Sequence, residues 1–289
     1  MTALVIGASG LVGGALCRAL GHTAVGTYRD RPIPGLIQLD AHDEAALRRI
    51  LDDVDPSTVF FPAAEPNVDW CELHPDDAYV ANVVPAISAL ALSVSRRAAF
   101  VFFSSDYVFD GEAGPYDEEA RTRPLSVYAR HKRDVEERVL EAGGTVVRTT
   151  TVFGSEQPPG KNFVVRLVTR LRVGDEVTVP FDQFSTPTWS DDLARATVAV
   201  AARGGVWHAA GPDYLARDAF ARLAAEVFGV DPGLVRPVST ADLRQPARRP
   251  LHAGLRTDKL ERETGIRFVP LRVALERFRD QRSAAELPE

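Results

Sequence analysis

The chain has 289 residues and a formal net charge of −6, with 45% hydrophobic and 26% charged residues. This composition is typical of a folded globular protein and excludes a disordered chain, while the acidic balance opposes general binding to nucleic acid or to an anionic membrane surface. Cys17 and Cys71 are too few for a disulfide framework or a four-ligand zinc site, so we expect a reducing, cytoplasmic setting. Because a strand and glycine pattern begins at the N-terminus, we expect no signal peptide, and we expect no segment to span a membrane.

The first half of the chain alternates short apolar runs with longer amphipathic ones, which predicts a parallel sheet with crossover helices. Strands are predicted at residues 3–6, 24–27, 36–39, 58–61, 99–103 and 145–148. Helices are predicted at residues 11–20, 43–52, 75–95 and 126–141. We therefore expect an α/β protein whose residues 1–154 form a Rossmann-type, doubly wound parallel sheet.

After Gly154 the alternation weakens. A Pro/Gly-rich loop at 155–162 leads into a basic amphipathic helix at 163–172 and a short strand at 177–179. Further helices are predicted at residues 190–202, 217–228, 257–264 and 271–282. We assign residues 155–289 mainly to a smaller C-terminal substrate-binding domain, and we expect a segment such as 206–208 to return to the main sheet.

Three glycines follow the first predicted strand and open the first helix, in a GxxGxxG spacing: Gly7, Gly10 and Gly13. Missing side chains permit a tight turn and close approach of a pyrophosphate, which then faces the N–H groups of the helix N-terminus. We predict an NAD(P) site here, and a tight structural turn is the alternative. The other residues expected to contact the cofactor in this loop are Ser9, Leu11 and Val12.

The end of the second strand indicates which cofactor is used. A basic residue at this place accepts the 2′-phosphate of NADPH, whereas an acidic one binds the ribose hydroxyls of NADH. Arg29 and Arg31 favour NADPH, and Asp30 keeps NADH as the alternative. Asp40, after the third strand, is expected to reach the adenine, with a loop-capping role as its alternative.

Tyr128 and Lys132 stand four residues apart in a predicted helix, so both side chains emerge on one face. A tyrosine hydroxyl has a pKa of about 10, and a neighbouring ammonium lowers it. Ser105 follows the strand at 99–103, at the carboxyl end of the sheet where α/β active sites lie. We interpret Ser105 and Tyr128 as hydrogen-bond and proton donors to a substrate carbonyl, with Lys132 also holding the cofactor ribose. For Tyr128 and Lys132 the alternative is a chance pair on a surface helix, and for Ser105 it is a cap at the strand end.

These residues resemble the dTDP-4-dehydrorhamnose reductases, a family of extended short-chain dehydrogenases. The segment SSDYVFDG at 104–111 is similar to the family signature, with Ser105 where the catalytic residue is usually threonine. Other similar segments follow in the family's order: AAEPNVDWCE at 63–72, PYDEE at 115–119, KNFV at 161–164, DQFSTPTWSDDLA at 182–194 and ARRP at 247–250. They cover nearly the whole chain.

The resemblance implies hydride transfer from NAD(P)H to the 4-keto group of a nucleotide-linked, dTDP-type 4-keto-6-deoxyhexose. It assigns catalysis to Ser105, Tyr128 and Lys132. It places further residues in the cofactor cleft: Ala63, Ala64 and Asn82. It places others at the substrate: Asp106, Tyr107, Asn162, Gln183 and Thr188, with Trp189 on the substrate side or filling the domain interface. A homodimer is compatible with it.

The chain also departs from the family. Thr151 stands where the family typically has a tryptophan that approaches the sugar, and Glu65 and Trp70 are unusual at their positions. The sequence therefore leaves the identity of the sugar undetermined. Two other functions fit the same motifs: a regulatory NADP-binding subunit like the β subunit of methionine adenosyltransferase, and a nucleotide-sugar epimerase or dehydratase. Glu286 and Glu289 lack ligand-like spacing, so we predict no metal.

Overall fold

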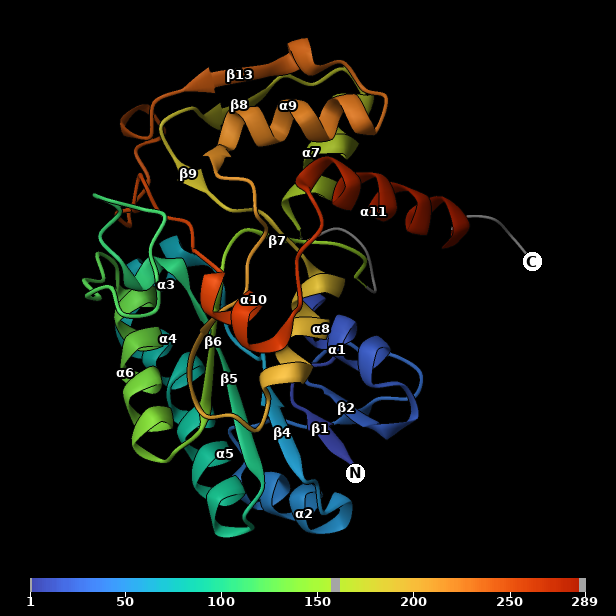
Figure 1. Cartoon of the computed structure of the whole chain (residues 1–289), viewed down its shortest axis with the longest axis vertical. Helices are drawn as coiled ribbons and strands as arrows, with labels where there is room; N and C mark the ends of the chain where they lie inside the picture. Colours follow the sequence, from blue (N-terminus) through green and yellow to red (C-terminus); the bar gives the residue numbers. More distant parts are fainter. Residues whose placement is uncertain (1, 157–161, 286–289) are drawn as a thin grey trace.

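The structure is a computed structural model that describes residues 2–156 and 162–285. Its centre is a seven-stranded sheet in the order β11-β6-β5-β4-β1-β2-β3, in which every neighbouring pair is parallel (Figure 1). The strands are β1 (Ala3–Val5), β2 (Ala24–Tyr28), β3 (Ile37–Gln38), β4 (Thr58–Phe61), β5 (Ala99–Ser105), β6 (Thr145–Thr149) and β11 (Gly205–His208). This order puts β1, β4 and β5 side by side, so their carboxyl ends meet at one edge.

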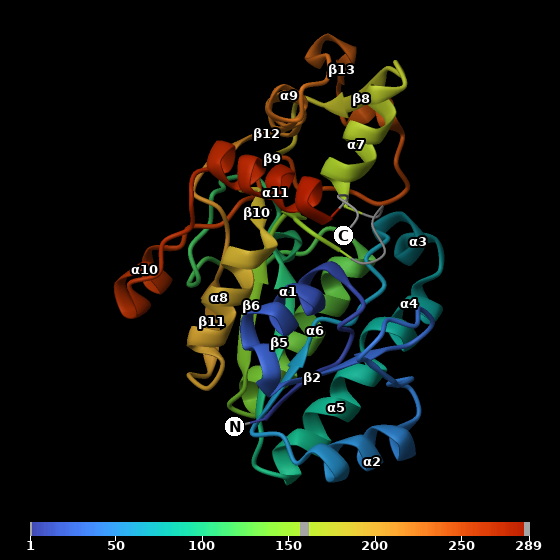
Figure 2. The ribbon, with the colours of Figure 1, turned by 90° about the vertical axis from the view of Figure 1, so that its right-hand side faces the viewer.

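Helices cover both faces of the sheet. One layer consists of α2 (Glu44–Val54), α5 (Val84–Ser95) and α6 (Val127–Glu141), and the other of α1 (Leu11–Leu20) and α8 (Ser190–Val200). Along β5, Phe100 and Phe102 pack in the first layer, whereas Val101 and Phe103 pack in the second, because successive strand side chains point to opposite faces. In Figure 2, α8 and α5 lie on opposite sides of the sheet. The predicted α/β fold with a doubly wound parallel sheet is confirmed.

The stretch predicted as one helix over residues 75–95 is two helices, α4 (Pro75–Asn82) and α5, with a break at Val83. Pro85 stands in the first turn of α5, where a missing backbone N–H is tolerated. By length and mean hydropathy of 1.6, Pro75–Ser95 would suffice to cross a bilayer, and the expectation that no segment spans a membrane stays a prediction. Half of that stretch is buried inside the molecule, as in the core helix of a folded domain.

A smaller part stands above the carboxyl end of the sheet (Figure 1). It contains α7 (Phe163–Arg172), α9 (Arg217–Val227), α11 (Leu271–Ala285), the parallel pair β8 (Val177–Pro180) and β13 (Val235–Val238), and the antiparallel pair β9 (Phe184–Ser185) and β12 (Leu215–Ala216). Phe153, Phe220 and Phe278 meet in its own core. Like α8, two further elements after residue 155 return to the larger part, α10 (Asp258–Thr264) and β11. Because β11 pairs with β6, the expected return of segment 206–208 is confirmed, while the domain division at residue 155 stays a prediction.

Several short elements escaped prediction: α3 (Val68–Leu73), the pair of β7 (Val152–Phe153) with β10 (Thr188–Trp189), the β9–β12 pair and β13. Each strand of the two smallest pairs has only 2 residues, which is too short to show a periodic pattern. Their pairing depends on where distant segments meet. Around the site, this matters most for the β9–β12 pair, which carries residues from two separate segments to one place.

Candidate active site

The turn between β1 and α1 presents bare backbone. Gly7 has φ +99°, a region that glycine populates freely. Its N–H donates to the Thr27 hydroxyl at 3.2 Å, and the Ala8 N–H donates to the Thr27 carbonyl at 2.7 Å, which fixes the turn on β2. Gly10 caps α1 without a side-chain hydrogen bond, and the first helical turn has no acidic residue. The first N–H groups of α1 therefore stay available to an anion.

No side chain larger than hydrogen fits at two of these glycines. A Cβ at Gly7 would lie 3.0 Å from Ala63, and a Cβ at Gly13 would lie 2.3 Å from the carbonyl oxygen of Gly7. The other residues predicted at this loop are half-buried around it: Ser9, Leu11 and Val12. The residues present thus form a cradle that fits the diphosphate of a dinucleotide.

The two residues expected near the adenosine lie at the rim of the sheet. Arg29 pairs with Asp30 at 2.7 Å, and both side chains are more than half exposed. Such a pair contributes only about 0–1 kcal/mol, so it leaves the guanidinium free to turn to a ligand. Asp40 accepts a hydrogen bond from the His42 N–H at 3.0 Å, and this bond lowers the pKa of the carboxyl. Asp40 therefore caps its own turn, and its contact with adenine stays a prediction.

The segment after β4 forms the wall opposite the glycine turn. Ala63 lies against that turn, and Ala64 follows it. Asn82 is buried, and its amide accepts from the Glu65 N–H at 2.8 Å and donates to the Glu65 carbonyl at 3.3 Å. Asn82 thus supports this wall. The Glu65 carboxylate accepts from the Asn67 N–H at 2.9 Å, so it is engaged in its own loop.

Ser105 is the last residue of β5. Its Oγ donates to Asp106 Oδ1 at 3.1 Å and accepts from the Tyr107 N–H at 3.2 Å. Asp106 is 1% exposed, its second oxygen accepts from the Gly254 N–H at 3.2 Å, and burial raises its pKa. Asp106 therefore orients the Ser105 hydroxyl. Its carboxyl is engaged with the protein while it also lines the pocket beside β5, so its contact with the sugar stays a prediction.

Tyr128 and Lys132 lie on one face of α6, as predicted. Lys132 Nζ donates to the Phe103 carbonyl at 2.9 Å and stands 5.7 Å from the centre of the Tyr128 ring. This bond places the ammonium beside the end of β5, two residues before Ser105. The Tyr107 ring meets the Tyr128 ring edge-on at 6.3 Å. The Tyr128 hydroxyl forms no hydrogen bond within the described part of the chain, so it is available to a substrate.

The electrostatics of Tyr128 differ from our expectation. Burial raises the pKa of the Tyr128 hydroxyl, and the nearby Tyr107 and Cys71 add to the effect. Burial also lowers the pKa of Lys132 to about 8, so its own positive charge is weakened. The expected net lowering of the Tyr128 pKa was therefore wrong, because removal from water outweighs the attraction of the ammonium. At neutral pH the tyrosine is protonated, which is the form that a proton donor needs.

A buried ion pair lies behind Lys132. Glu136 is fully buried, and its carboxylate accepts from Nε and Nη2 of Arg148 at 2.8 and 2.7 Å. Arg148 Nη1 is also 3.5 Å from Nε2 of His208. The Glu136 charge raises the pKa of Lys132 against the effect of burial. We did not predict this pair, although Glu136 follows Lys132 by four residues and so shares its helix face.

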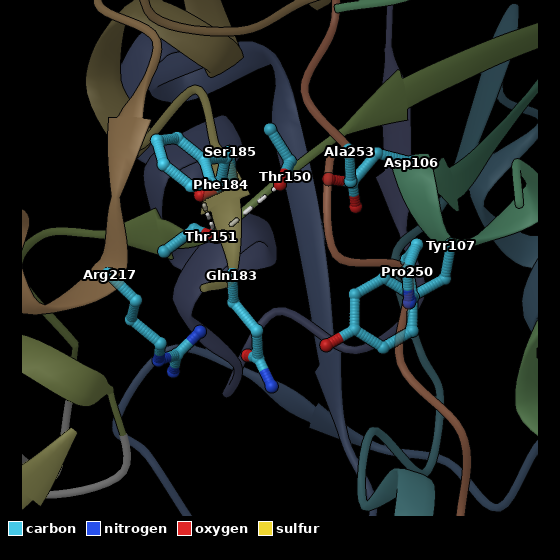
Figure 3. Close-up of a pocket in the computed structure, with 10 residues that line it drawn as sticks. All are labelled: Asp106, Tyr107, Thr150, Thr151, Gln183, Phe184, Ser185, Arg217, Pro250 and Ala253. Atoms are coloured by element: carbon cyan, nitrogen blue, oxygen red, sulfur yellow. Dashed lines mark hydrogen bonds between the residues drawn. The ribbon is translucent and has the colours of Figure 1, made fainter. Parts of the chain in front are cut away.

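A pocket opens beside the end of β5, and Figure 3 shows its lining. Tyr107 and Gln183, both predicted at the substrate, reach into it. Thr151 has φ +42°, rare for a β-branched residue, and its hydroxyl lies 3.1 Å from that of Ser185. Arg217 also lines the pocket. Sequence reasoning missed Arg217, because one arginine at the start of a helix resembles any solvated charge.

Two other predicted substrate residues serve the fold. Asn162 caps α7: its Oδ1 accepts from the Val165 N–H at 3.1 Å, and its Nδ2 donates to the Gly154 carbonyl at 3.0 Å. Thr188 is fully buried, and its hydroxyl donates to the Thr186 carbonyl at 3.0 Å. The polar groups of Asn162 and Thr188 are thus engaged with the protein, and their contact with the sugar stays a prediction. Trp189 packs in the core of the smaller part.

Some sequence features lie outside the described residues: Lys161 of the KNFV segment, the loop residues 157–160, and the tail with Glu286 and Glu289. Within residues 2–156 and 162–285, no group of three or more His, Cys, Asp or Glu side chains is arranged to hold a metal ion.

The fold and the site together define an extended short-chain dehydrogenase/reductase. A doubly wound parallel sheet carries a glycine turn after β1, a serine ends β5, and a tyrosine and a lysine share one face of α6. Residues 1–283 match the family model described as the RmlD substrate binding domain. The chain belongs to this family.

Individual relatives agree with the family match. A probable dTDP-4,6-dihydroxy-2-methyloxan-3-one 4-ketoreductase of Streptomyces antibioticus is 36% identical over 276 residues, covering 93% of this chain and 90% of its own. The crystal structure of a dTDP-4-dehydrorhamnose reductase from Clostridium acetobutylicum has a TM-score of 0.86 at 30% identity, covering 98% and 100% of the two chains. A dTDP-4-dehydrorhamnose reductase from Bacillus anthracis in complex with NADP has a TM-score of 0.87 at 25% identity, covering 97% and 100%.

Proposed function

We propose that this protein is an NADPH-dependent reductase of the 4-keto group of a dTDP-linked 4-keto-6-deoxy sugar. The observation that carries the proposal is the placement of Ser105, Tyr128 and Lys132 at the sheet edge to which the glycine turn also belongs. Membership of the RmlD family supports it, as do the names of the relatives, which are reductases of dTDP-linked ketosugars.

The side chains divide the reduction of a carbonyl between them. When bound, NADPH supplies the hydride that reaches the carbonyl carbon. Tyr128, whose pKa is raised by burial, is protonated and donates its proton to the carbonyl oxygen. The Ser105 hydroxyl, turned from Asp106 to the substrate, would donate a hydrogen bond to the same oxygen, so the charge that develops there meets two O–H donors. The Lys132 ammonium then stabilises the phenolate that remains on Tyr128.

The cofactor side of the proposal rests on the bare turn and the basic rim. The diphosphate would lie on the α1 N-terminus, at Gly7, Gly10 and Gly13, and Arg29 would accept the 2′-phosphate in exchange for its exposed partner Asp30. The complex of the Bacillus anthracis relative with NADP supports NADPH, and NADH remains the alternative cofactor. Ala63, Ala64 and Asn82 would form or support the wall of the cleft, and Lys132 would hold the ribose.

On the substrate side, Tyr107 and Gln183 would contact the sugar nucleotide. The Thr151 and Ser185 hydroxyls offer hydrogen bonds where the family typically has an aromatic ring. The proposal therefore covers both dTDP-4-keto-rhamnose and a related deoxysugar. It includes a cytoplasmic setting, which the free thiols of Cys17 and Cys71 support, and is compatible with a homodimer.

The test is turnover of a panel of dTDP-linked 4-keto-6-deoxy sugars by the purified protein with NADPH and, separately, NADH. We expect NADPH oxidation matched by one reduced sugar per cofactor. Tight NADP binding without reduction of any sugar would favour a regulatory subunit. Purification with bound NAD, and conversion of a sugar nucleotide without added cofactor, would favour an epimerase or dehydratase.

A further inference from the structure

Arg217 lines the pocket beside Tyr107 without a partner for its charge. Within the described residues, its guanidinium forms no ion pair and no side-chain hydrogen bond. Its neighbour Arg249, by contrast, makes a two-pronged pair with Asp69, at 2.6 and 2.8 Å. Removing a guanidinium from water is costly unless a partner replaces the water. An uncompensated arginine inside a pocket is therefore a binding group for an anion.

The structure holds Arg217 in place for such a role. Its guanidinium lies over the Phe163 ring, 4.5 Å from the centre, and its backbone N–H donates to the Gln183 carbonyl at 2.8 Å. Phe163 opens α7, whose first turn is capped by Asn162. Stacking limits the rotamers of the side chain, so less freedom is lost when a ligand binds. Asn162 thus fixes the start of the helix whose Phe163 ring supports Arg217.

The local charge also favours an anion, although the protein as a whole carries −6. Arg166 and Arg249 both add positive potential at Arg217, and burial lowers the pKa of Arg217. Asp106, the carboxyl that acts on Arg217, is engaged with Ser105 and Gly254. Positive charge is therefore in excess at this end of the pocket.

The pocket links this charge to the catalytic tyrosine. Figure 3 shows Arg217, Gln183 and Tyr107 reaching into the same pocket. The Tyr107 ring in turn meets the Tyr128 ring edge-on at 6.3 Å. An anion at Arg217 and a carbonyl at Tyr128 would thus occupy two ends of one ligand. A sugar joined to a diphosphate has these two groups.

We infer that Arg217 binds the diphosphate of the sugar nucleotide and so sets the sugar's position against Tyr128. The inference rests on the proposed function. It concerns how substrate is held, so Arg217 is a binding residue for the nucleotide and takes no part in proton or hydride transfer.

The experiment measures binding of dTDP and of thymidine to the full-length protein by calorimetry, for the wild type and the variants Arg217→Gln and Arg217→Lys. The matched control is Arg262→Gln, which removes an exposed guanidinium on α10. We expect Arg217→Gln to weaken dTDP binding by about 10- to 100-fold, the usual loss for a charge-assisted contact. Thymidine and NADPH binding should change less than about twofold, and Arg217→Lys should lose part of the dTDP affinity because the charge stays and the planar fork is lost.

The outcomes separate the two proposals. A wild type that binds no dTDP would overturn the proposed function and this inference together. Wild-type dTDP binding that is unchanged in Arg217→Gln would overturn the inference alone. Equal weakening of dTDP, thymidine and NADPH would show that Arg217 serves the fold, and a lowered melting temperature in both Arg217 variants would also assign it to the fold.

Discussion

Ser105, Tyr128 and Lys132 come from two elements and meet through one hydrogen bond, from Lys132 to the Phe103 carbonyl. Because that carbonyl belongs to β5, the bond sets the height of α6 relative to the strand that ends in Ser105. The residue identities and the four-residue spacing were readable in the sequence. The state of the groups was not, because burial raises the pKa of Tyr128 and lowers that of Lys132, and burial is a property of the packed molecule.

At the scale of single residues, Tyr128→Phe should lower the rate of the chemical step by a factor of about 10² or more, because the proton donor is lost. NADPH affinity should stay within about twofold. Single-turnover kinetics and a cofactor titration check this result. Tyr79→Phe, on the neighbouring α4, is the control for loss of a tyrosine hydroxyl. Normal turnover of Tyr128→Phe would refute the assignment of the acid.

The pKa of Lys132 gives a pH dependence. The ammonium is the form that stabilises phenolate, and burial lowers its pKa to about 8. We expect kcat/KM to be constant near pH 7 and to fall as pH rises through about 8, since the proton on Lys132 is then lost. Steady-state rates between pH 6.5 and 10, with stability checked at each pH, measure this. A flat profile to pH 10 would contradict the role of Lys132.

At the scale of elements, the β1–α1 turn was the most predictable part of the site. Glycine spacing after a strand defines it, and α1 begins and ends at the predicted residues. The stretch over 75–95 was less predictable. Its apolar pattern continues through the break at Val83, and only the position of the proline marks where the second helix begins. Asn162 shows a third case, because a residue in a family motif can be retained for a helix cap as well as for a ligand contact.

The turn also gives a matched pair of variants. Gly13→Ala would put a Cβ 2.3 Å from the Gly7 carbonyl oxygen, whereas a Cβ at Gly14 would have no neighbour closer than 3.5 Å. We expect Gly13→Ala to lower the free energy of unfolding by about 1–3 kcal/mol. It should also weaken NADPH binding by at least about tenfold. Gly14→Ala should leave NADPH binding intact and stabilise the helix by about 0.5–1 kcal/mol. Urea unfolding and a cofactor titration test both, and equal behaviour of the two variants would argue against the close packing.

At the scale of the whole molecule, a buried polar network ties the layers together. Glu136 on α6 pairs with Arg148 on β6, and Arg148 approaches His208 on β11. His208 Nδ1 lies 3.2 Å from the Tyr116 carbonyl. The network joins segments that are up to 92 residues apart. Polar groups are stable in the interior only when they are paired. These pairs therefore favour the strand order that brings the partners together.

His208 makes the stability depend on pH. Burial lowers its pKa to about 3 from an unfolded value of 6.5, so between these values the unfolded chain binds the extra proton. The free energy of unfolding should therefore fall as pH decreases below about 6.5, with His208 contributing up to about 1.4 kcal/mol per pH unit. His208→Gln should flatten this slope, while the exposed His22→Gln should not. Urea unfolding at pH 7, 6, 5 and 4 measures the slopes, and parallel slopes in wild type and His208→Gln would disprove the contribution.

The sequence by itself determined the alternation of strands and helices, the glycine turn and the identities of the catalytic residues. These depend on local spacing: two or four residues along a strand or helix, and a turn that only glycine permits. Only the tertiary structure decided that Asn162 and Thr188 are engaged with the protein, that Asp106 is bonded to Ser105 and Gly254, and that Arg217 stands in the pocket with no charge partner among the described residues. Those outcomes depend on which distant groups meet and how much water is removed, because a polar side chain serves a ligand only when the fold leaves it without a partner.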